Sequence, residues 1–262
     1  MEKISIIIPA YNEEKRIGRT LDEYGRFFQD LESRKALNYE ILIVINNTQD
    51  KTEDIVKSYA KKNKNISYIN LKRGGKGYAI IEGFKKALKN DKITLVGFLD
   101  ADMSTPPKEY YRLILNIKDY DGIIASRYLK DSIVKPKQSF QRIFVSRFFN
   151  ILVRMLFMLN YRDTQCGAKV FKKEALEKII DQLGETSWAI DIDLLYKSKV
   201  SNLRILEFPT VWSDKSESKL NIKKASIQMF FAVIQLRLLN SPFRIFVRTL
   251  GPIRGLVWRI LR

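Results

Sequence analysis

The 262-residue sequence has no histidine, a single cysteine and few prolines, seven in all. The absence of histidine excludes Ser-His-Asp catalysis, histidine-containing metal sites and imidazole acid–base chemistry. One cysteine excludes a disulfide framework and a cysteine-based zinc site, and it suits a reducing compartment. We interpret Cys166 as a small buried residue, because no imidazole is present to activate its thiol. Chemistry must therefore use carboxylates, lysine, arginine, hydroxyls, backbone amides or an oxygen-ligated metal ion.

The sequence also lacks any run of 18 apolar residues, so it predicts no simple transmembrane helix. Residues 1–9 are too short for a secretory signal and predict a strand instead. Basic residues outnumber acidic ones, with 47 Lys and Arg against 29 Asp and Glu and a formal charge of +18. Much of this excess lies among apolar residues. Segment 225–262 has six arginines and no acidic residue, and segment 139–159 has a similar composition.

These basic, apolar segments predict interfacial helices at 225–239 and 243–261, separated by Ser241 and Pro242. Arginine binds phosphate, and apolar neighbours can enter the headgroup region of a bilayer. We therefore expect contact with a membrane surface, with Trp258 at the lipid boundary and the protein cytoplasmic and peripheral on the inner face. The alternative is that these helices pack onto the domain or onto a second protomer. The expected division is a catalytic domain at 1–221 and membrane-associating helices at 222–262.

Apolar runs bounded by turn residues alternate with segments of helical period along the first half of the chain. The runs are almost continuously hydrophobic, as expected for strands that helices cover on both faces. The alternation predicts βαβ units and a mostly parallel sheet, an α/β fold. Strands are predicted at 4–9, 40–46, 67–71, 94–100 and 122–126, with helices at 16–31, 52–62, 77–88 and 107–117 between them. Beyond these we expect helices at 139–159, 173–182 and 190–199, strands at 168–171 and 204–209, and a polar loop at 213–219.

Polar or glycine-rich stretches follow the first four predicted strands. Ligands of open parallel sheets bind beyond the carboxyl ends of the strands, so these stretches are expected to form a site. Asp100 and Asp102 follow the fourth strand, and residues two apart in an extended chain project to one side. Two carboxylates suit Mg²⁺ or Mn²⁺, which would neutralise the charge of a diphosphate leaving group. The alternative is that Asp100 only caps the next helix.

A glycine-rich turn, Gly74-Gly75-Lys76-Gly77, opens the third predicted helix. It is not a Walker A loop, because Asn70 and Gly77 stand where that loop requires glycine and serine or threonine. Backbone amides at a helix start, together with Lys76, suit an anion. A plain glycine turn with a solvated lysine accounts for these residues equally well.

Short motifs occur in order along the chain. They are Ile8-Pro9-Ala10-Tyr11-Asn12-Glu13, Asn47-Thr48-Gln49-Asp50-Lys51-Thr52, Gly75-Lys76-Gly77, Asp100-Ala101-Asp102, Ser126-Arg127-Tyr128, Asp163-Thr164-Gln165-Cys166-Gly167-Ala168-Lys169-Val170-Phe171, Trp188-Ala189-Ile190-Asp191-Ile192-Asp193-Leu194-Leu195, and Trp212 with Ser218-Lys219-Leu220. Together they resemble the family 2 glycosyltransferases of GT-A fold. Within these, the sequence is most similar to the polyprenyl-phosphate hexose synthases of the dolichyl-phosphate β-glucosyltransferase type. The resemblance spans about residues 4–220, and its Thr-Gln-Cys-Gly block is more specific than its Asp-x-Asp.

The resemblance implies a metal-dependent, inverting transfer of a hexose, glucose for this type, from a nucleotide diphosphate sugar such as UDP-glucose to a polyprenyl or dolichyl phosphate. It implies that Asp100 and Asp102 hold Mg²⁺ or Mn²⁺, with Ser104 nearby, and that Arg127 and Arg142 face the acceptor phosphate. Asp191 would approach the sugar, and Asp191, Asp102 and Arg127 would be the catalytic residues. The residues implied for nucleotide-sugar binding are Pro9, Tyr11, Glu13, Asn46, Lys76, Asp100 and Gln165.

Two positions depart from the family pattern. Many members have an acidic pair that contacts the uracil and ribose where this sequence has Ile45 and Asn46. An amide in place of a carboxylate changes donor–acceptor matching, so the sequence leaves UDP and GDP both open. Asp193 stands where glutamate is common and is one methylene shorter.

The chemistry of the acceptor can also be argued from the residues. A sugar hydroxyl must lose a proton and needs a general base such as Asp191, whereas a lipid phosphate is already an anion and needs positioning by arginines. The absence of histidine and the scarcity of candidate bases favour the phosphate. The alternative acceptor is a glycan hydroxyl. The alternative for Asp191 is a structural role, as an acidic residue in the first turn of a helix. A basic nucleic-acid-binding protein is the distant alternative, since a charge of +18 attracts polyphosphates. We expect no nucleic-acid partner, because the basic residues form no recognisable nucleic-acid motif.

Overall fold

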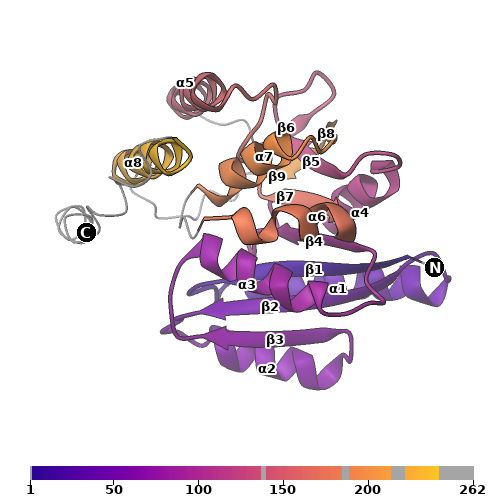
Figure 1. The fold of residues 1–262 in the computed structure, drawn as a ribbon. Helices are drawn as coiled ribbons and strands as arrows, with labels where there is room; N and C mark the ends of the chain where they lie inside the picture. Colours follow the sequence, from indigo (N-terminus) through magenta and orange to yellow (C-terminus); the bar gives the residue numbers. More distant parts are fainter. Residues whose placement is uncertain (1, 137–139, 185–188, 214–221, 242–262) are drawn as a thin grey trace.

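The computed structural model describes residues 2–136, 140–184, 189–213 and 222–241, which form a twisted sheet covered by helices on both faces (Figure 1). The strands are β1 (Lys3–Ala10), β2 (Asn38–Asn46), β3 (Ile66–Leu71), β4 (Leu95–Leu99), β5 (Gly122–Ser126), β6 (Ile133–Lys135), β7 (Ala168–Lys172), β8 (Ile205–Pro209) and β9 (Val211–Ser213). The helices are α1 (Ile17–Ser33), α2 (Thr52–Lys62), α3 (Lys76–Leu88), α4 (Pro107–Asn116), α5 (Phe140–Phe157), α6 (Lys173–Ile179), α7 (Ile190–Val200) and α8 (Ile222–Leu239), with a 3₁₀ turn at Ile180–Gln182.

The main sheet of the described residues has seven strands in the order β3-β2-β1-β4-β7-β5-β8. All neighbouring strands run parallel except β7, which is antiparallel to both β4 and β5. The predicted α/β fold with a mostly parallel sheet is thus confirmed, whereas the reversed strand at its centre was not predicted. Because β4 ends where β7 begins, Leu99 pairs with Ala168 and the loops at residues 100 and 167 meet.

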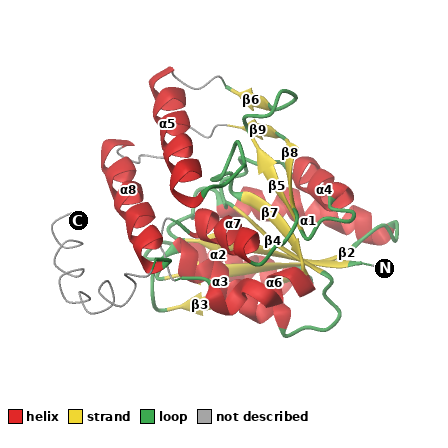
Figure 2. Ribbon diagram, turned by 45° about the horizontal axis from the view of Figure 1, so that its top comes forward, coloured by secondary structure: helices red, strands yellow, loops and turns green. Residues whose placement is uncertain are grey.

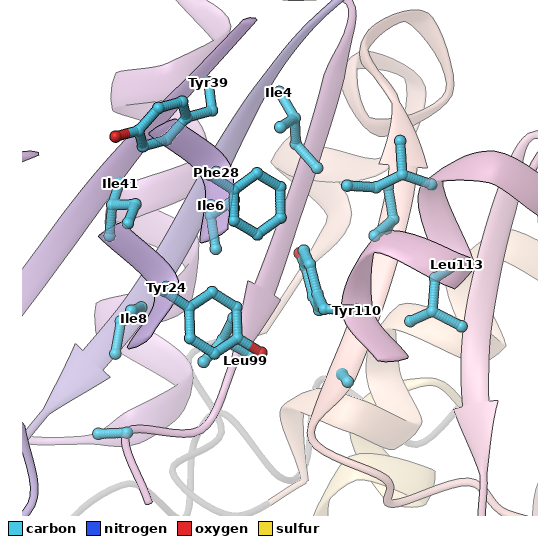
Figure 3. Packing of buried hydrophobic residues seen from close by; sticks show 14 of the residues in the cluster. Ile4, Ile6, Ile8, Tyr24, Phe28, Tyr39, Ile41, Leu99, Tyr110 and Leu113 are labelled. Carbon is cyan, nitrogen blue, oxygen red and sulfur yellow. The ribbon is translucent and has the colours of Figure 1, made fainter. Parts of the chain in front are cut away.

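The core lies on both faces of this sheet. Ile6 and Ile8 of β1 pack with Tyr24 and Phe28 of α1 on one face, together with residues of α2 and α4 (Figure 3). Ile7, between them in sequence, packs on the other face against α3, α6 and α7. Side chains alternate along a strand, so a continuous apolar run serves two cores. Burying each such isoleucine contributes about 1.5–3 kcal/mol.

A third apolar cluster joins α5, α7 and α8, and α5 and α8 lie side by side at one edge of the molecule (Figure 2). Val153 and Phe157 of α5 and Val233 and Leu236 of α8 are buried in it. The described parts of the basic, apolar segments, α5 and α8, therefore pack onto the domain. The helix predicted at 243–261 and most of the polar loop at 213–219 lie outside the described residues.

Element boundaries follow the sequence closely in most places. Helix α4 begins at Pro107, where the sequence predicted its start, because proline has no amide hydrogen to leave unpaired at a helix start. The predicted helix at 173–182 divides into α6 and the 3₁₀ turn. The small parallel sheet of β6 and β9 was not predicted, since three-residue strands are too short to show a periodic pattern.

Candidate active site

Asp100 and Asp102 lie in a turn immediately after β4. The amide of Asp100 donates to the carbonyl of Gly167 (3.2 Å), and the amide of Ser104 donates to Asp102 Oδ1 (2.9 Å). The extended geometry expected from their spacing is wrong, because residues 101 and 102 form a turn. The carboxylates are still close enough that Asp102 adds to the effect of burial in raising the pKa of Asp100. The N-cap of α4 is Pro106, so Asp100 does not cap that helix.

Lys76 is the first residue of α3, and its ammonium contacts the carboxylates of this turn. Its Nζ lies 2.5 Å from Asp100 Oδ1 and 4.0 Å from Asp191 Oδ2. Burial alone would lower the pKa of Lys76, but the neighbouring Asp100 and Asp191 outweigh it and raise the pKa. The preceding residue, Gly75, has a φ of 136°, a conformation that favours glycine. The glycine-rich turn therefore directs a charged lysine into the site rather than into solvent.

Gly167, just before β7, lies next to Asp100, just after β4. A Cβ atom added at this residue would lie 1.9 Å from Asp100 Oδ2. Only a residue without a side chain fits beside the carboxylate in this position. The glycine of the Thr-Gln-Cys-Gly block thus sets where Asp100 can lie.

Asp191 is in the first turn of α7, whose N-cap is Ala189. Its side chain is 8% exposed, and its Oδ1 accepts a hydrogen bond from Lys169, a completely buried residue of β7. The first-turn location fits the structural alternative for Asp191. Its contact with Lys169 and its proximity to Lys76 place it in the site as well.

The carboxylates of Asp100 and Asp102 are the oxygen donors that this site offers to a divalent cation. Among the described residues, no group of three or more His, Cys, Asp and Glu side chains forms a metal cage. Hard cations such as Mg²⁺ commonly take one or two carboxylates and complete their coordination with water and substrate phosphates. Asp100 and Asp102 supply two mutually repelling carboxylates at an open strand end, and the ammonium of Lys76 already balances part of their charge. The pair fits a cation held jointly with a diphosphate.

Asn46 occupies the position where the family often has an acidic residue, and its amide is used inside the protein. Its Nδ2 donates to the carbonyl of Ala10 (3.1 Å), and its Oδ1 accepts from the amide of Gly75 (3.1 Å). A carboxylate could not make the first of these hydrogen bonds. Buried Asn46 therefore connects the end of β1 to the start of α3.

The other residues expected at the nucleotide lie around the end of β1. Tyr11 is 53% exposed, and Pro9 is partly buried. Glu13 forms a bidentate pair with Arg16, at 2.7 and 2.9 Å, and its amide donates to Thr52 Oγ1 (2.8 Å). Burial raises the pKa of Glu13 despite the opposing effect of Arg16.

Arg127 follows β5 and is held by a buried carboxylate. Its Nε and Nη2 donate to Asp163 at 2.7 and 2.9 Å, and its backbone amide donates to the same side chain at 3.0 Å. Asp163 has no exposed surface, and although burial opposes it, Arg127 lowers the pKa of this carboxyl. The guanidinium also lies 5.3 Å from the ring centroid of Trp212. Arg142 belongs to α5, but its side chain is outside the described residues.

The loop between α5 and β7 brings Gln165 next to α8. Gln165 Nε2 lies 2.8 Å from Met229 Sδ, so this side chain contacts α8. The neighbouring Cys166 is 1% exposed, which confirms the expected buried location, and burial raises the pKa of its thiol to about 12. Such a thiol is a poor nucleophile at neutral pH.

Three further residues of the site lie within the sequence motifs, but the sequence alone assigns them no role. Asp163, Gly167 and Lys169 each act on a partner from another element, namely Arg127, Asp100 and Asp191. Their residue types carried a signal, since a lysine and an aspartate are rarely buried without a partner. Which residue each one pairs with is set by the fold.

Residues 5–180 match the model of glycosyl transferase family 2. The chain is 34% identical over 245 residues to a dolichyl-phosphate beta-glucosyltransferase of Dictyostelium discoideum, covering 89% of this chain and 73% of the relative. It is 30% identical over 257 residues to the human protein of that name, covering 93% and 78%. The chain belongs to the family 2 glycosyltransferases.

The fold of this glycosyltransferase is shared with a solved enzyme of the GT-A type. It superimposes with a TM-score of 0.64 on glucosyl-3-phosphoglycerate synthase from Mycobacterium tuberculosis, crystallised with Mn²⁺, UDP and glucosyl-3-phosphoglycerate. The match covers 90% of this chain and 80% of the other at 15% identity. At that identity the likeness establishes the GT-A fold, which confirms the predicted fold class.

Proposed function

We propose that this glycosyltransferase moves a hexose, glucose, from a nucleotide diphosphate sugar, UDP-glucose, to a dolichyl or related polyprenyl phosphate. The relatives that bear a dolichyl-phosphate beta-glucosyltransferase name match over most of the chain and support this acceptor. The observation that carries the proposal is the surface of α5 and α8 beside the site.

That surface, which we call the α5/α8 face, is apolar and basic. Five residues of α5 and the turn after it are exposed at helical spacing: Val145, Phe148, Ile151, Met155 and Met158, between 42% and 74% exposed. Phe230 and Phe231 of α8 are also exposed. Neither helix contains an acidic residue. An apolar surface without negative charge suits the boundary of an anionic bilayer.

The α5/α8 face is connected to the acceptor side of the site. Tyr128, next to Arg127, hydrogen-bonds through its hydroxyl to Ser146 of α5 (2.6 Å), and Gln165 contacts Met229 of α8. Arg147 of α5 lies 5.1 Å from the Tyr128 ring centroid. A phosphate presented from a membrane at these helices would therefore arrive beside Arg127. Arg142, on α5, would add a second guanidinium.

The proposed reaction needs no proton transfer from the acceptor. A phosphate oxygen forms the bond to the anomeric carbon, the bond to the diphosphate breaks, and the nucleotide leaves with the electron pair, inverting the centre. Asp100 and Asp102 would hold Mg²⁺ or Mn²⁺, which supplies charge neutralisation to the diphosphate. Lys76 would face the same phosphates, and Asp191 would face the sugar. Charge-assisted hydrogen bonds from the guanidinium groups of Arg127 and Arg142 would position the acceptor.

The first test is a transfer assay on the full chain in detergent with polyprenyl phosphate. UDP-glucose, GDP-mannose and UDP-N-acetylglucosamine are supplied in turn, each with labelled sugar. We expect label to enter the lipid phase from UDP-glucose and to be lost with EDTA. Lipid labelling from another donor would overturn the choice of sugar. Donor hydrolysis without lipid labelling would favour a glycan hydroxyl as the acceptor, with Asp191 as its base.

An arginine variant tests the acceptor assignment separately. Arg142→Ala is expected to raise the KM for polyprenyl phosphate by about tenfold or more, since a charge-assisted hydrogen bond contributes about 1.5–3 kcal/mol. The KM for the donor should stay nearly unchanged. Arg34→Ala, at an exposed end of α1, is the control, and it should change neither constant. Loss of donor binding in Arg142→Ala would contradict the acceptor role.

Membrane contact, peripheral and on the cytoplasmic face, is part of the same proposal. None of the helices in the described residues is long and apolar enough to cross a membrane. Replacing both Phe148 and Met155 by serine should reduce binding to vesicles containing phosphatidylserine by about tenfold or more, because two large apolar side chains are lost. Leu115→Ser, an equally exposed apolar residue of α4, is the control. Equal binding by both variants would contradict the α5/α8 face as the contact surface.

A further inference from the structure

Lys169 is a charged side chain with no exposed surface at the centre of the sheet. It belongs to β7, the strand that runs opposite to its neighbours, and its Nζ lies 5.4 Å from the ring centroid of Phe98. The ammonium donates to the carbonyl of Cys166 (2.6 Å) and to Asp191 Oδ1. Burying an ammonium is costly unless it is paired and hydrogen-bonded. An apolar residue would fill this position without the free-energy cost of desolvating a charge. Packing alone therefore does not explain a lysine at this position.

The reason lies in the arrangement of charges above Lys169. Lys169 contacts Asp191, Asp191 lies 4.0 Å from Lys76, and Lys76 lies 2.5 Å from Asp100. Positive and negative groups thus alternate from the buried sheet to the open strand end. The four residues come from four elements: β7, α7, α3 and the turn after β4. Lys169 is the innermost member and the one that solvent does not reach.

We infer that Lys169 is a positioning residue that fixes the side chain of Asp191, and through it Lys76, at the donor-sugar end of the site. This inference rests on the proposed function, in which Asp191 faces the hexose. One oxygen of Asp191 is committed to Lys169, and the other faces Lys76. Both oxygens of Asp191 thus face ammonium groups of the protein. With its direction set in this way, Asp191 acts as a fixed hydrogen-bond acceptor for the sugar.

Asp191 is in the first turn of α7, between Ile190 and Ile192, which are both completely buried in the core. These neighbours fix the backbone of the helix start, but they do not fix the direction of the Asp191 side chain. The contact with Lys169 of β7 supplies that direction. Reacting groups displaced by about 1 Å can lose on the order of 10²-fold in rate, so an anchor of this kind affects turnover directly.

The test is a double-mutant cycle with Lys169→Met, Asp191→Asn and both together. Lys169→Met is expected to lower kcat by about 10²-fold while the donor KM stays within about threefold. Because Lys169 acts through Asp191, adding Lys169→Met to Asp191→Asn should reduce kcat little further. Lys173→Met is the matched control. It removes a lysine just after the other end of β7 that pairs with Asp91, before β4, and it should leave kcat unchanged.

Each outcome of the cycle decides the inference. Wild-type turnover in a folded Lys169→Met would overturn it, as would a full second loss in the Asp191→Asn background. If Lys169→Met does not fold, Lys169→Gln replaces it. Glutamine keeps a donor for Asp191 but not the charge, so its loss of kcat is expected to be smaller than about 10²-fold. An equal loss from Lys169→Gln in the Asp191→Asn background would overturn the inference, because Lys169 would then not be acting through Asp191.

Failure of the proposed function gives a different result. If the wild type transfers no hexose to polyprenyl phosphate, the acceptor assignment falls. The cycle is then run on donor hydrolysis, where the loss from Lys169→Met and its absence in the Asp191→Asn background still test the pairing.

Discussion

The two halves of the site are held together by different forces. On the nucleotide side, loops after β1 and β2 are joined by hydrogen bonds between short polar side chains and backbone. The backbone amide of Asn12 donates to Thr48 Oγ1 (3.0 Å), and the backbone amide of Gln49 donates to Asn12 Oδ1 (2.8 Å). On the side of the sugar and the acceptor, which we call the acceptor side, buried ion pairs connect distant elements, Arg127 with Asp163 and Lys169 with Asp191.

The difference follows from what each half must present. The nucleotide side presents backbone and small polar groups at strand ends, for which left-handed turn residues such as Asn12 and Asn47 suffice. The acceptor side must hold cationic and anionic side chains in fixed directions near an apolar surface. A buried charge keeps its direction only where its partner and hydrogen bonds are complete. Charge pairing thus makes this half precise and also makes it sensitive to the loss of one partner.

Breaking the Arg127–Asp163 pair is the largest expected effect. Asp163→Ala removes the acceptor of three N–H groups of Arg127 and leaves a guanidinium buried without its counter-charge. The free energy of unfolding, measured by urea denaturation, should fall by about 3–5 kcal/mol.

Asp91→Ala is the matched comparison, because it breaks the Lys173–Asp91 pair, in which the aspartate is fully exposed. Its cost should be less than about 1 kcal/mol. An equal loss of unfolding free energy in Asp163→Ala and Asp91→Ala would contradict the view that buried ion pairs hold the acceptor side together.

Gly167→Ala tests the point where the two halves meet. The added Cβ would lie 1.9 Å from Asp100 Oδ2, so the carboxylate must move. We expect metal-dependent transfer to fall by about 10²-fold with little change in folding, since displacement of about 1 Å is enough for such a loss. The measurements are kcat and the Mn²⁺ concentration for half-maximal rate. Gly18→Ala, whose nearest contact would be 3.7 Å, is the control, and a similar loss there would contradict the explanation.

The strand ends of the nucleotide half were predicted from the sequence, whereas the ion pairs of the acceptor half were not, for a physical reason. On the nucleotide side, the site residues directly follow the strands predicted at 4–9 and 94–100. Side chains that follow parallel strands lie at the same edge of the sheet, so a short stretch of sequence is enough to place them. Arg127 and Asp163 are 36 residues apart, and Lys169 and Asp191 are 22 apart. No periodic pattern pairs such residues. The reversed strand β7, which brings Lys169 beneath Asp191, is a property of the whole sheet.

Asp193 sharpens the comparison, because it is a buried carboxylate of the acceptor side without an ion-pair contact among the described residues. Burial raises its pKa from 3.8 to about 6, although the Gly184 amide, which donates to Oδ2 at 2.6 Å, and Lys197 oppose the rise. Its Oδ1 has no hydrogen-bond partner among the described residues. Because the folded-state pKa lies above the unfolded value, the folded state holds the proton more strongly. The contribution to stability is present below about pH 4 and is lost as the pH rises through about 6.

Asp193→Asn should remove this pH dependence while keeping an oxygen for the Gly184 amide. The free energy of unfolding of the variant, relative to wild type, should increase by about 2 kcal/mol between about pH 4 and pH 7, since one pKa unit corresponds to about 1.4 kcal/mol. Urea denaturation of both proteins across this range measures the difference, in which the other titrating groups cancel. A difference that does not change with pH would mean that Asp193 has an ionic partner, and the acceptor side would then be held by paired charge throughout.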